Sequence, residues 1–500
     1  MRFLSPGSRT PKPHWHVCCA AASRQKESYP SDSSKPRSSF AQRKADARHD
    51  LAAERSRPAE TSGGPSGGAP EQRRGRPQPS QPVVRTAGKK SGGTFFHSKT
   101  FEEVGASPEI ISALNTLGIK RPSHVQVAAY QALLSSAPHI VLGDHAGSGK
   151  TLAYLLPLVQ RMREEERAGG VNKRGKAPRV VVLAPTAELC TQVLRVARAL
   201  ARGAPFKSVV LTGGHKWRTQ KEALEEGPDL VVATPGRLIE HLKEGNLALD
   251  LCKAIVMDEV DILLGDTTSF AEQIQPLRQA AGTDVRFVLV TATLPEYIYA
   301  QLQQDFPGIQ AAIGPGLHRT APGIVEQLVD CSGGDVIDEE TGFERKAHSL
   351  MRLLRQNTVA RTIVFCNKIE TCRKVENLLT RSLGADMQVL PYHSAIVENV
   401  RTRNLQTFLA KPQGSTRAVL ICTDRASRGV DSAYVEHVVL FDFCRDPSEY
   451  VRRVGRTGRG AGGVGLVSIL VLGRQVQLAR QIIERNQSGL PIHSVPLATI

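Results

Sequence analysis

The 500-residue sequence contains no apolar run that approaches the 18 residues a membrane-spanning helix needs, so we expect no membrane span. Its nine cysteines form no Cys-x-x-Cys pair, and some of them, such as Cys366 and Cys422, lie inside apolar stretches. This distribution favours buried, small hydrophobic side chains in a reducing compartment.

Residues 1–95 lack any apolar periodicity. They contain 18 Lys and Arg against 7 Asp and Glu, and so carry +11 of the chain's net charge of +17. Ser, Pro, Gly and Arg dominate their composition. Such a segment cannot bury enough apolar surface to offset the entropy lost on ordering, so we expect a disordered basic extension.

The first 26 residues contain five Lys and Arg, several Ser and no acidic residue. They also lack the apolar stretch of a secretory signal, and this composition is typical of an organellar transit peptide. The sequence Val-Cys-Cys-Ala (17–20) resembles the processing site of plastid transit peptides. We therefore expect a transit peptide over 1–20, a disordered basic segment over 21–95, and localisation in the plastid stroma, with the mitochondrion as the alternative.

The sequence DHAGSGKT (144–151) follows an apolar stretch (139–143) and precedes a helical one. A turn of this kind directs backbone N–H groups and a helix N-terminus at a phosphate chain. Lys150 adds a positive charge, and Thr151 offers a hydroxyl to Mg²⁺. The residues expected to hold the nucleotide here are Ala146, Gly147, Ser148, Gly149, Lys150 and Thr151.

A second apolar stretch (254–257) ends in Asp258 and Glu259, within the sequence IVMDEVD (255–261). A carboxylate at such a strand end can hold Mg²⁺, partly through water, and its neighbour can orient an attacking water. Because the acidic segment follows the glycine-rich turn in the right order, the two together indicate a nucleoside-triphosphate site.

From about residue 100, short β-branched stretches alternate with helical ones, and the pattern restarts after a Gly- and Pro-rich segment (314–323). Continuous apolar strands followed by helices predict parallel sheets covered on both faces. The fold class expected is α/β, with two tandem RecA-like doubly wound domains. The expected strands are 139–143, 179–184, 208–212, 229–233, 253–257, 286–290, 361–366, 417–422, 436–440 and 464–470. The expected helices are 187–202, 216–226, 235–244, 344–356, 369–383 and 473–486.

Ten segments in order resemble the motifs of DEAD-box RNA helicases, over about residues 96–475. Phe101, GIKRP (118–122) and Gln126 look like the adenine-recognising Q motif, and AGSGKT, DEVD and TAT (291–293) like motifs I, II and III. PTAELC (185–190), Gly213-Gly214 and TPGRL (234–238) resemble RNA-contacting segments of the first domain. IVFCN (363–367), TDRASRGVD (423–431) and YVRRVGRTGRG (450–460) resemble motifs IV, V and VI.

The resemblance implies an ATP-binding domain over 96–313, a linker over 314–323, a C-terminal helicase domain over 324–475, and a C-terminal helix and tail over 476–500. ATP and Mg²⁺ are the implied cofactors, and a monomer is expected. RNA is the implied partner, bound through its sugar-phosphate backbone and independently of base sequence.

The resemblance also implies roles for single residues. Phe101, Gln126 and the ribose contact Asp431 would bind ATP, while Arg456 and Arg459 would act as arginine fingers. Coupling between the sites would use Asp261, Thr291, Thr293 and Arg452. RNA would contact Pro185, Thr186, Gly213, Gly214, Thr234, Arg237, Thr423, Asp424 and Arg428.

Four positions depart from the family pattern. Asp144 replaces a small residue, Ala146 a Thr, Ala187 an Arg and Arg452 a His. A carboxylate near a triphosphate is unfavourable unless it turns outward or binds a cation. The form RRVGRT is similar to plastid-type members of the family.

These observations lead to three hypotheses. The first is an ATP-dependent RNA helicase that melts short duplexes, in organellar rRNA maturation or ribosome assembly, with organellar pre-ribosomal particles as partners. The second is a weakly hydrolysing, ATP-gated RNA clamp that serves as an assembly scaffold. A DNA-translocating relative ranks third, because such proteins share motifs I, II and VI but lack Gln126 with its upstream Phe.

Overall fold

The computed structural model describes residues 95–169, 175–265, 270–333, 338–383, 387–411, 416–424 and 434–492. The predicted transit peptide (1–20) and the basic segment (21–95), apart from Phe95, lie outside these residues. Arg428 and Asp431 lie outside them too. Within the described residues, no helix is both long and apolar enough to cross a membrane.

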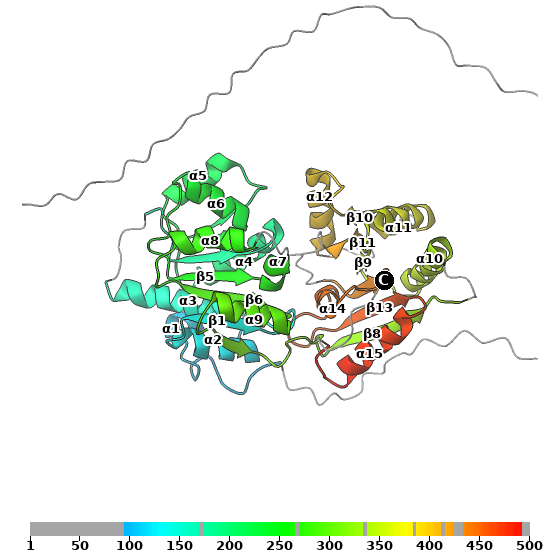
Figure 1. Ribbon diagram of the computed structural model, residues 1–500, viewed down its shortest axis with the longest axis horizontal. Helices are drawn as coiled ribbons and strands as arrows, with labels where there is room; N and C mark the ends of the chain where they lie inside the picture. Colours follow the sequence, from blue (N-terminus) through cyan, green and yellow to red (C-terminus); the bar gives the residue numbers. More distant parts are fainter. Residues whose placement is uncertain are drawn as a thin grey trace, which may run out of the picture. The chain divides into compact units, whose positions relative to one another are not determined.

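The first domain is built on a seven-stranded sheet with the order β3–β4–β2–β5–β6–β1–β7 (Figure 1). All its strand pairs are parallel. The strands are β1 (His139–Gly143), β2 (Val180–Leu183), β3 (Ser208–Leu211), β4 (Leu230–Ala233), β5 (Ala254–Asp258), β6 (Arg286–Thr291) and β7 (Gln310–Ile313). The helices are α1 (Pro108–Thr116), α2 (His124–Leu134), α3 (Lys150–Arg167), α4 (Ala187–Leu200), α5 (Trp217–Glu225), α6 (Pro235–Lys243), α7 (Val260–Gly265), α8 (Phe270–Ala280) and α9 (Glu296–Asp305).

The second domain contains a six-stranded sheet, also parallel, with the order β10–β11–β9–β12–β13–β8. Its strands are β8 (Ile324–Asp330), β9 (Arg361–Phe365), β10 (Met387–Tyr392), β11 (Arg417–Cys422), β12 (His437–Leu440) and β13 (Gly465–Val471). Its helices are α10 (Glu339–Gln356), α11 (Ile369–Ser382), α12 (Glu398–Leu409), α14 (Pro447–Val454) and α15 (Gln475–Gln487). The prediction of two tandem RecA-like parallel domains is therefore confirmed.

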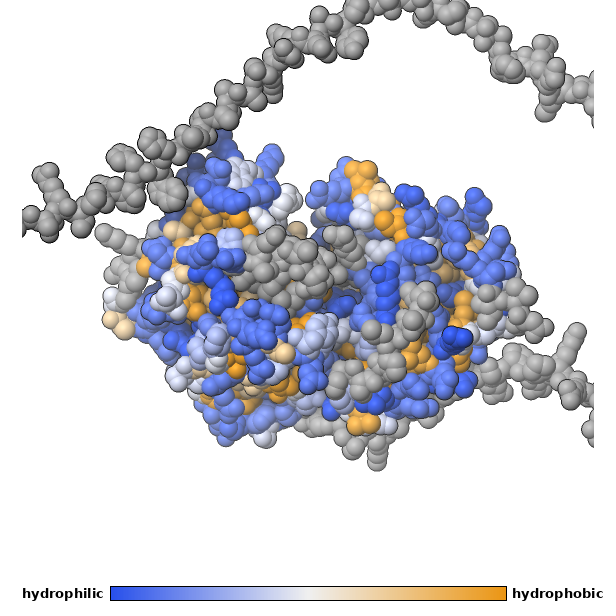
Figure 2. Space-filling model, viewed as in Figure 1, coloured by the Kyte–Doolittle hydropathy of each residue, from blue (hydrophilic) through white to orange (hydrophobic). Residues whose placement is uncertain are grey.

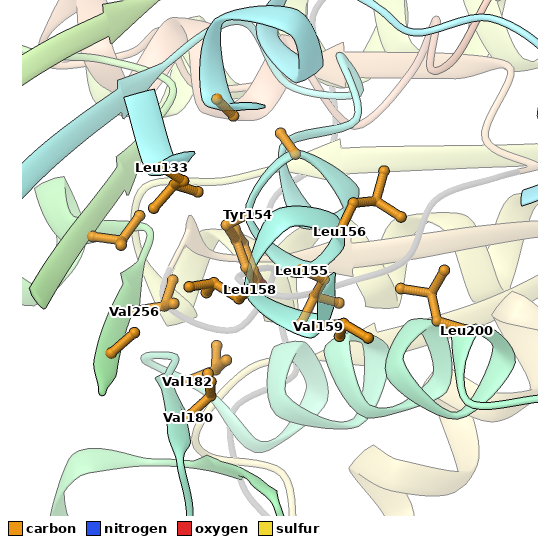
Figure 3. Close-up of a cluster of buried hydrophobic side chains, with 14 of the residues drawn as sticks. Leu133, Tyr154, Leu155, Leu156, Leu158, Val159, Val180, Val182, Leu200 and Val256 are labelled. Atoms are coloured by element: carbon orange, nitrogen blue, oxygen red, sulfur yellow. The ribbon is translucent and has the colours of Figure 1, made fainter. Parts of the chain in front are cut away.

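Each sheet separates two hydrophobic clusters, because its strands alternate apolar side chains onto both faces. On one face of the first sheet, α3 lies against the strands, with Tyr154 and Leu158 directed towards Val182 and Val256 (Figure 3). This packing fixes the N-terminal end of α3 beside the carboxyl end of β5. In the view of Figure 2, most of the described surface is hydrophilic, with smaller hydrophobic groups between.

Local capping explains where several of the helices begin. Ser107, Thr186 and Asp446 precede α1, α4 and α14, and each side chain accepts a backbone N–H of the first turn. Pro108 occupies the first turn of α1, where its missing N–H costs no hydrogen bond. These hydrogen bonds fix where each of the three helices begins.

The strands and helices expected from the sequence are all present, with ends within two residues except that α10 begins at Glu339. Asp338 caps that helix by accepting the Thr341 N–H at 2.7 Å, a signal the apolar pattern does not contain. Three strands were not predicted. Edge strand β7 is largely exposed, edge strand β8 carries polar residues such as buried Glu326, and edge strand β10 contains Pro391, so none has a continuous apolar pattern.

Candidate nucleotide and RNA site

The phosphate loop leaves β1 at Gly143 and enters α3 at Lys150. Gly147 and Gly149 have φ of +83° and +92°, a conformation that only glycine adopts without strain. Gly149 caps an 18-residue helix, so the first N–H groups and the positive end of the α3 dipole face the loop. The loop thus has the geometry of a phosphate-binding turn.

Two cationic side chains approach this loop. Lys150 Nζ donates to the carbonyl oxygens of Asp144 and His145, both at 2.8 Å, and burial lowers the pKa of its ammonium group. From the second domain, Arg459 lies so close that a Cβ on Gly147 would be 3.2 Å from its Cα. Glycine at 147 is therefore also needed for the approach of Arg459.

The carboxylates predicted for metal and water lie at the end of β5. Asp258 is 5% exposed and accepts the hydroxyl hydrogen of Tyr154 at 3.1 Å. Burial, with the charge of Glu259, raises the Asp258 pKa to about 6 despite the nearby Lys150. Glu259 has a φ of +53°, which strains a residue with a side chain. Its Oε1 lies 3.7 Å from Arg456 Nη2 of the second domain.

The residues here suit Mg²⁺. Burial raises the pKa of Tyr154, and both Asp258 and Thr151 act on its hydroxyl, so this tyrosine lies against both predicted metal contacts. In the described residues, no cluster of three His, Cys, Asp or Glu side chains could form a metal cage. Mg²⁺ keeps several waters and binds through one or two carboxylates plus phosphate, which fits such a sparse set.

The Asp144 side chain is turned toward Gly314 and Gly316. Its carboxylate, only 2% exposed, accepts the backbone N–H groups of His145 and Gly316 at 2.8 Å and contacts His145 Nδ1 at 3.1 Å. Burial raises its pKa, but His145 and Lys150 lower it more, so the net shift is downward. Gly316 belongs to the segment 314–323 between the domains. Asp144 thus fastens the phosphate loop to the interdomain segment.

The four predicted coupling residues are linked by hydrogen bonds and an ion pair. Asp261 Oδ2 accepts the Thr293 hydroxyl at 2.8 Å and Arg452 Nη1 at 3.2 Å. Thr291 joins this set through Thr293: its hydroxyl donates to the Thr293 carbonyl oxygen at 2.6 Å and accepts the Thr293 N–H at 3.1 Å. Arg452 comes from α14 of the second domain, so this pair links the domains.

A cavity of about 630 Å³ adjoins the phosphate loop, lined among others by Phe95, His124, His145 and Ser148. Gln126 contacts the phosphate loop: its Oε1 accepts the Ser123 N–H at 2.9 Å, and its Nε2 donates to the Gly149 carbonyl oxygen at 3.3 Å. Phe101 does not line the cavity but is buried in the core of the first domain. Binding of the adenine base by Gln126 and Phe101 stays a prediction. To bind a base, the Gln126 amide would have to give up its hydrogen bonds to Ser123 and Gly149.

In the first domain, the predicted RNA residues follow three neighbouring strands. Thr186 caps α4 after β2, the exposed Gly213 and Gly214 follow β3, and Thr234 begins α6 after β4. Pro185 directly precedes Thr186. Arg237 Nη2 lies 3.9 Å from the position of a Gly213 Cβ, so the second and third segments meet.

In the second domain, Asp424 is held by Arg453, which pairs with both its carboxylate oxygens. Arg453 also donates to Asn367 and Glu449 and has a fully buried side chain. The Asp424 carboxylate is thus engaged by Arg453, and its neighbour Thr423 is half-buried. Sequence reasoning missed Arg453 and Tyr154. The first lies inside the RRVGRT segment, and the second lies one helical turn after Lys150.

The fold and the loop define a P-loop protein with two RecA-like domains, whose second domain supplies arginines to the first. Residues 123–300 match the DEAD/DEAH box helicase family, and residues 345–461 match the helicase conserved C-terminal domain.

The chain is similar to DEAD-box ATP-dependent RNA helicase 50 of Arabidopsis thaliana, with 48% identity over 81% of this chain and 52% of that protein. It is similar to ATP-dependent RNA helicase DbpA of Escherichia coli, with 32% identity over 78% of this chain and 79% of that protein. The chain therefore spans about half the length of the Arabidopsis relative. It belongs to the DEAD-box family of ATP-dependent RNA helicases.

Among solved structures, the fold resembles S. cerevisiae Dbp5 bound to RNA and ADP BeF3. The TM-score is 0.64, at 23% identity over 79% of this chain and 94% of that chain. At this identity, the likeness bears on the fold alone.

The raised pKa of Asp258 makes a prediction for the metal-free protein. Since the folded-state pKa of about 6 lies above the usual 3.8, ionisation of Asp258 destabilises the fold as the pH rises through 6. In EDTA, Asp258→Asn should unfold like the parent near pH 4 and be more stable by about 1 to 3 kcal/mol at pH 8. Denaturant unfolding across pH measures this, with exposed Asp250→Asn as the control. A stability difference that does not change with pH would contradict the assignment.

Proposed function

We propose that this chain is an RNA-dependent ATPase that separates short RNA duplexes by closing its two domains on ATP and RNA. The observation that carries the proposal is the reach of Arg456 and Arg459 from the second domain to Glu259 and the phosphate loop of the first. Hydrolysis would then require both domains. The names of the Arabidopsis and E. coli relatives, both ATP-dependent RNA helicases, support the same activity here.

In the proposed ATP hydrolysis, each part of the site has a separate role. The N–H groups of the loop and Lys150 would bind phosphates, while Thr151 and Asp258 would hold Mg²⁺. Bound ATP would supply the phosphoryl group that is transferred to water, with ADP as the leaving group, and bound Mg²⁺ would neutralise charge on its phosphates. Glu259 orients that water, and Arg456 and Arg459 stabilise charge that develops on the phosphate.

RNA binding would use the exposed backbone at Gly213 and Gly214 together with Arg237. Backbone N–H groups and a guanidinium grip phosphates and carry no base preference, so binding should be independent of sequence. Because these contacts lie in the first domain and Thr423 and Asp424 lie in the second, closure would join the two halves of the RNA site.

Glu259→Gln tests the proposed reaction. The amide keeps the volume of the side chain but loses the charge that orients water, so turnover should fall by at least about a hundredfold while ATP and RNA still bind. Steady-state ATPase with and without RNA, and nucleotide titration, measure both effects. Exposed Glu244→Gln is the matched control. A parent protein without RNA-stimulated ATPase would contradict the function, and an active Glu259→Gln would contradict the residue's role.

A second candidate function is the weakly hydrolysing RNA clamp. The ion pair between Arg452 and Asp261, with Asp261 also bound to Thr293, favours it. A guanidinium does not lose its charge near neutral pH and offers a fixed fork of donors, so this link between domains would open slowly.

Arg452→His distinguishes the two candidates. If the ion pair prolongs closure, the variant should release RNA several-fold faster and unwind more duplex per ATP hydrolysed. Stopped-flow RNA release and a duplex-separation assay measure these rates, with exposed Arg403→His as the control. Unchanged RNA release and unchanged unwinding per ATP would remove the support for a clamp.

We further propose a site of action in the plastid, in rRNA maturation or ribosome assembly. The support is the composition of the first 26 residues, which carry five basic residues and no acidic one. Residues 1–95 with their net charge of +11 would also add sequence-independent RNA affinity where they are retained.

N-terminal sequencing of the protein recovered from plant cells tests the targeting segment. A mature chain that starts near Ala20 or Ala21 is expected, because Val17 to Ala20 resemble a processing site. Recovery from the plastid fraction should accompany it. An intact Met1, or recovery outside organelles, would contradict the proposal.

A further inference from the structure

Trp217 occupies a place at the RNA side of the first domain that no motif accounts for. It begins α5, three residues after the exposed Gly214. Its ring stacks on that of His241 in α6, with centroids 3.9 Å apart and planes 1° from parallel. Figure 1 shows α5 and α6 side by side at this end of the domain. The indole is thus held in one plane.

His241 forms a rigid, uncharged support for the indole. It is fully buried, and neither ring nitrogen has a hydrogen-bond partner among the residues the structure describes. Burial and the charge of Arg237 lower the pKa of the imidazole, so the ring is neutral near pH 7. A neutral ring packs against the indole without adding charge to the site.

Arg237 lies one helical turn before His241 on α6, so both can face the same indole. Its guanidinium carbon is 5.3 Å from the centre of the Trp217 ring, within the range of a cation–π contact. Arg237 Nη2 lies 3.9 Å from the position of a Gly213 Cβ, and Nη1 pairs with the exposed Glu240 at 3.1 Å. The guanidinium is therefore held beside the exposed Gly213 backbone.

We propose that Trp217 positions the Arg237 guanidinium to bind a phosphate of single-stranded RNA beside Gly213 and Gly214. A guanidinium that stacks on an aromatic ring still has its in-plane N–H groups available for a phosphate. The exposed pair with Glu240 is weak and is readily exchanged for a phosphate. Trp217 is a positioning residue, and the inference rests on the proposed RNA binding.

A double-mutant cycle tests this in the full-length protein. Binding of a labelled single-stranded RNA, with a non-hydrolysable ATP analogue, is measured by anisotropy at several salt concentrations. Trp217→Leu should weaken binding about two- to fivefold, the size of an exposed cation–π contact, whereas Trp217→Phe keeps an aromatic face and should stay within about twofold. Arg237→Ala should lower the slope of log affinity against log salt by about 0.7, as expected for one lost phosphate contact.

The decisive variant combines Trp217→Leu with Arg237→Ala. If Trp217 acts through Arg237, adding Trp217→Leu to Arg237→Ala should cause no further loss. An equal loss in both backgrounds would overturn the proposal, since it would mean direct stacking of a base on Trp217 or damage to the Gly213–Gly214 turn.

Fluorescence gives a readout that is independent of affinity. The chain has two tryptophans, Trp15 and Trp217, so Trp15→Phe leaves Trp217 as the only indole. RNA that engages Arg237 should change the emission of Trp217. If the labelled RNA binds and the Trp217 emission does not change, the RNA binds away from Arg237. That result would overturn the positioning role of Trp217 but leave the proposed RNA binding intact. A parent protein that binds no RNA would contradict the proposed function as well.

Discussion

The structure depends on a division of charge between two domains. The first domain holds the phosphate loop and the acidic end of β5, and the second brings Arg452, Arg456 and Arg459 to them. Arg452 pairs with Asp261, Arg456 lies 3.7 Å from Glu259, and Arg459 lies against Gly147. Because these charges meet across the boundary, the proposed nucleotide hydrolysis would be coupled to domain closure.

Two departures from the family pattern bear on this boundary. The Asp144 carboxylate, which would repel a triphosphate, is instead bound to Gly316 of the interdomain segment. Leu294 N also donates to His318 Nε2 of that segment at 3.2 Å. The segment between the domains is thus fastened to the ends of β1 and β6. Ala146 lies against Gly455 of the second domain, since a Cβ on Gly455 would be 2.5 Å from the Ala146 methyl carbon, so glycine at 455 allows this approach.

Much of this was predictable from sequence, because apolar strands and glycine-rich turns encode local geometry. The order of Lys150, Thr151, Asp258 and Glu259 along the chain already located the nucleotide end of the first sheet. Contacts between residues far apart in the sequence could not be predicted in this way. Asp144 accepts the backbone N–H of a glycine 172 residues later, and the Arg453–Asp424 pair joins α14 to the end of β11. Edge strands β7 and β10 were missed because exposed or proline-containing strands lack an apolar pattern.

The central claim is that ATP and RNA bind to the same closed arrangement of the two domains. Its most direct test is the dissociation constant for single-stranded RNA with a non-hydrolysable ATP analogue and with ADP, together with the reverse titration. The account predicts that the analogue tightens RNA binding by at least about tenfold over ADP, and that RNA enhances the analogue's affinity over ADP's by the same factor, as linkage requires. Equal RNA affinity with both nucleotides would contradict it.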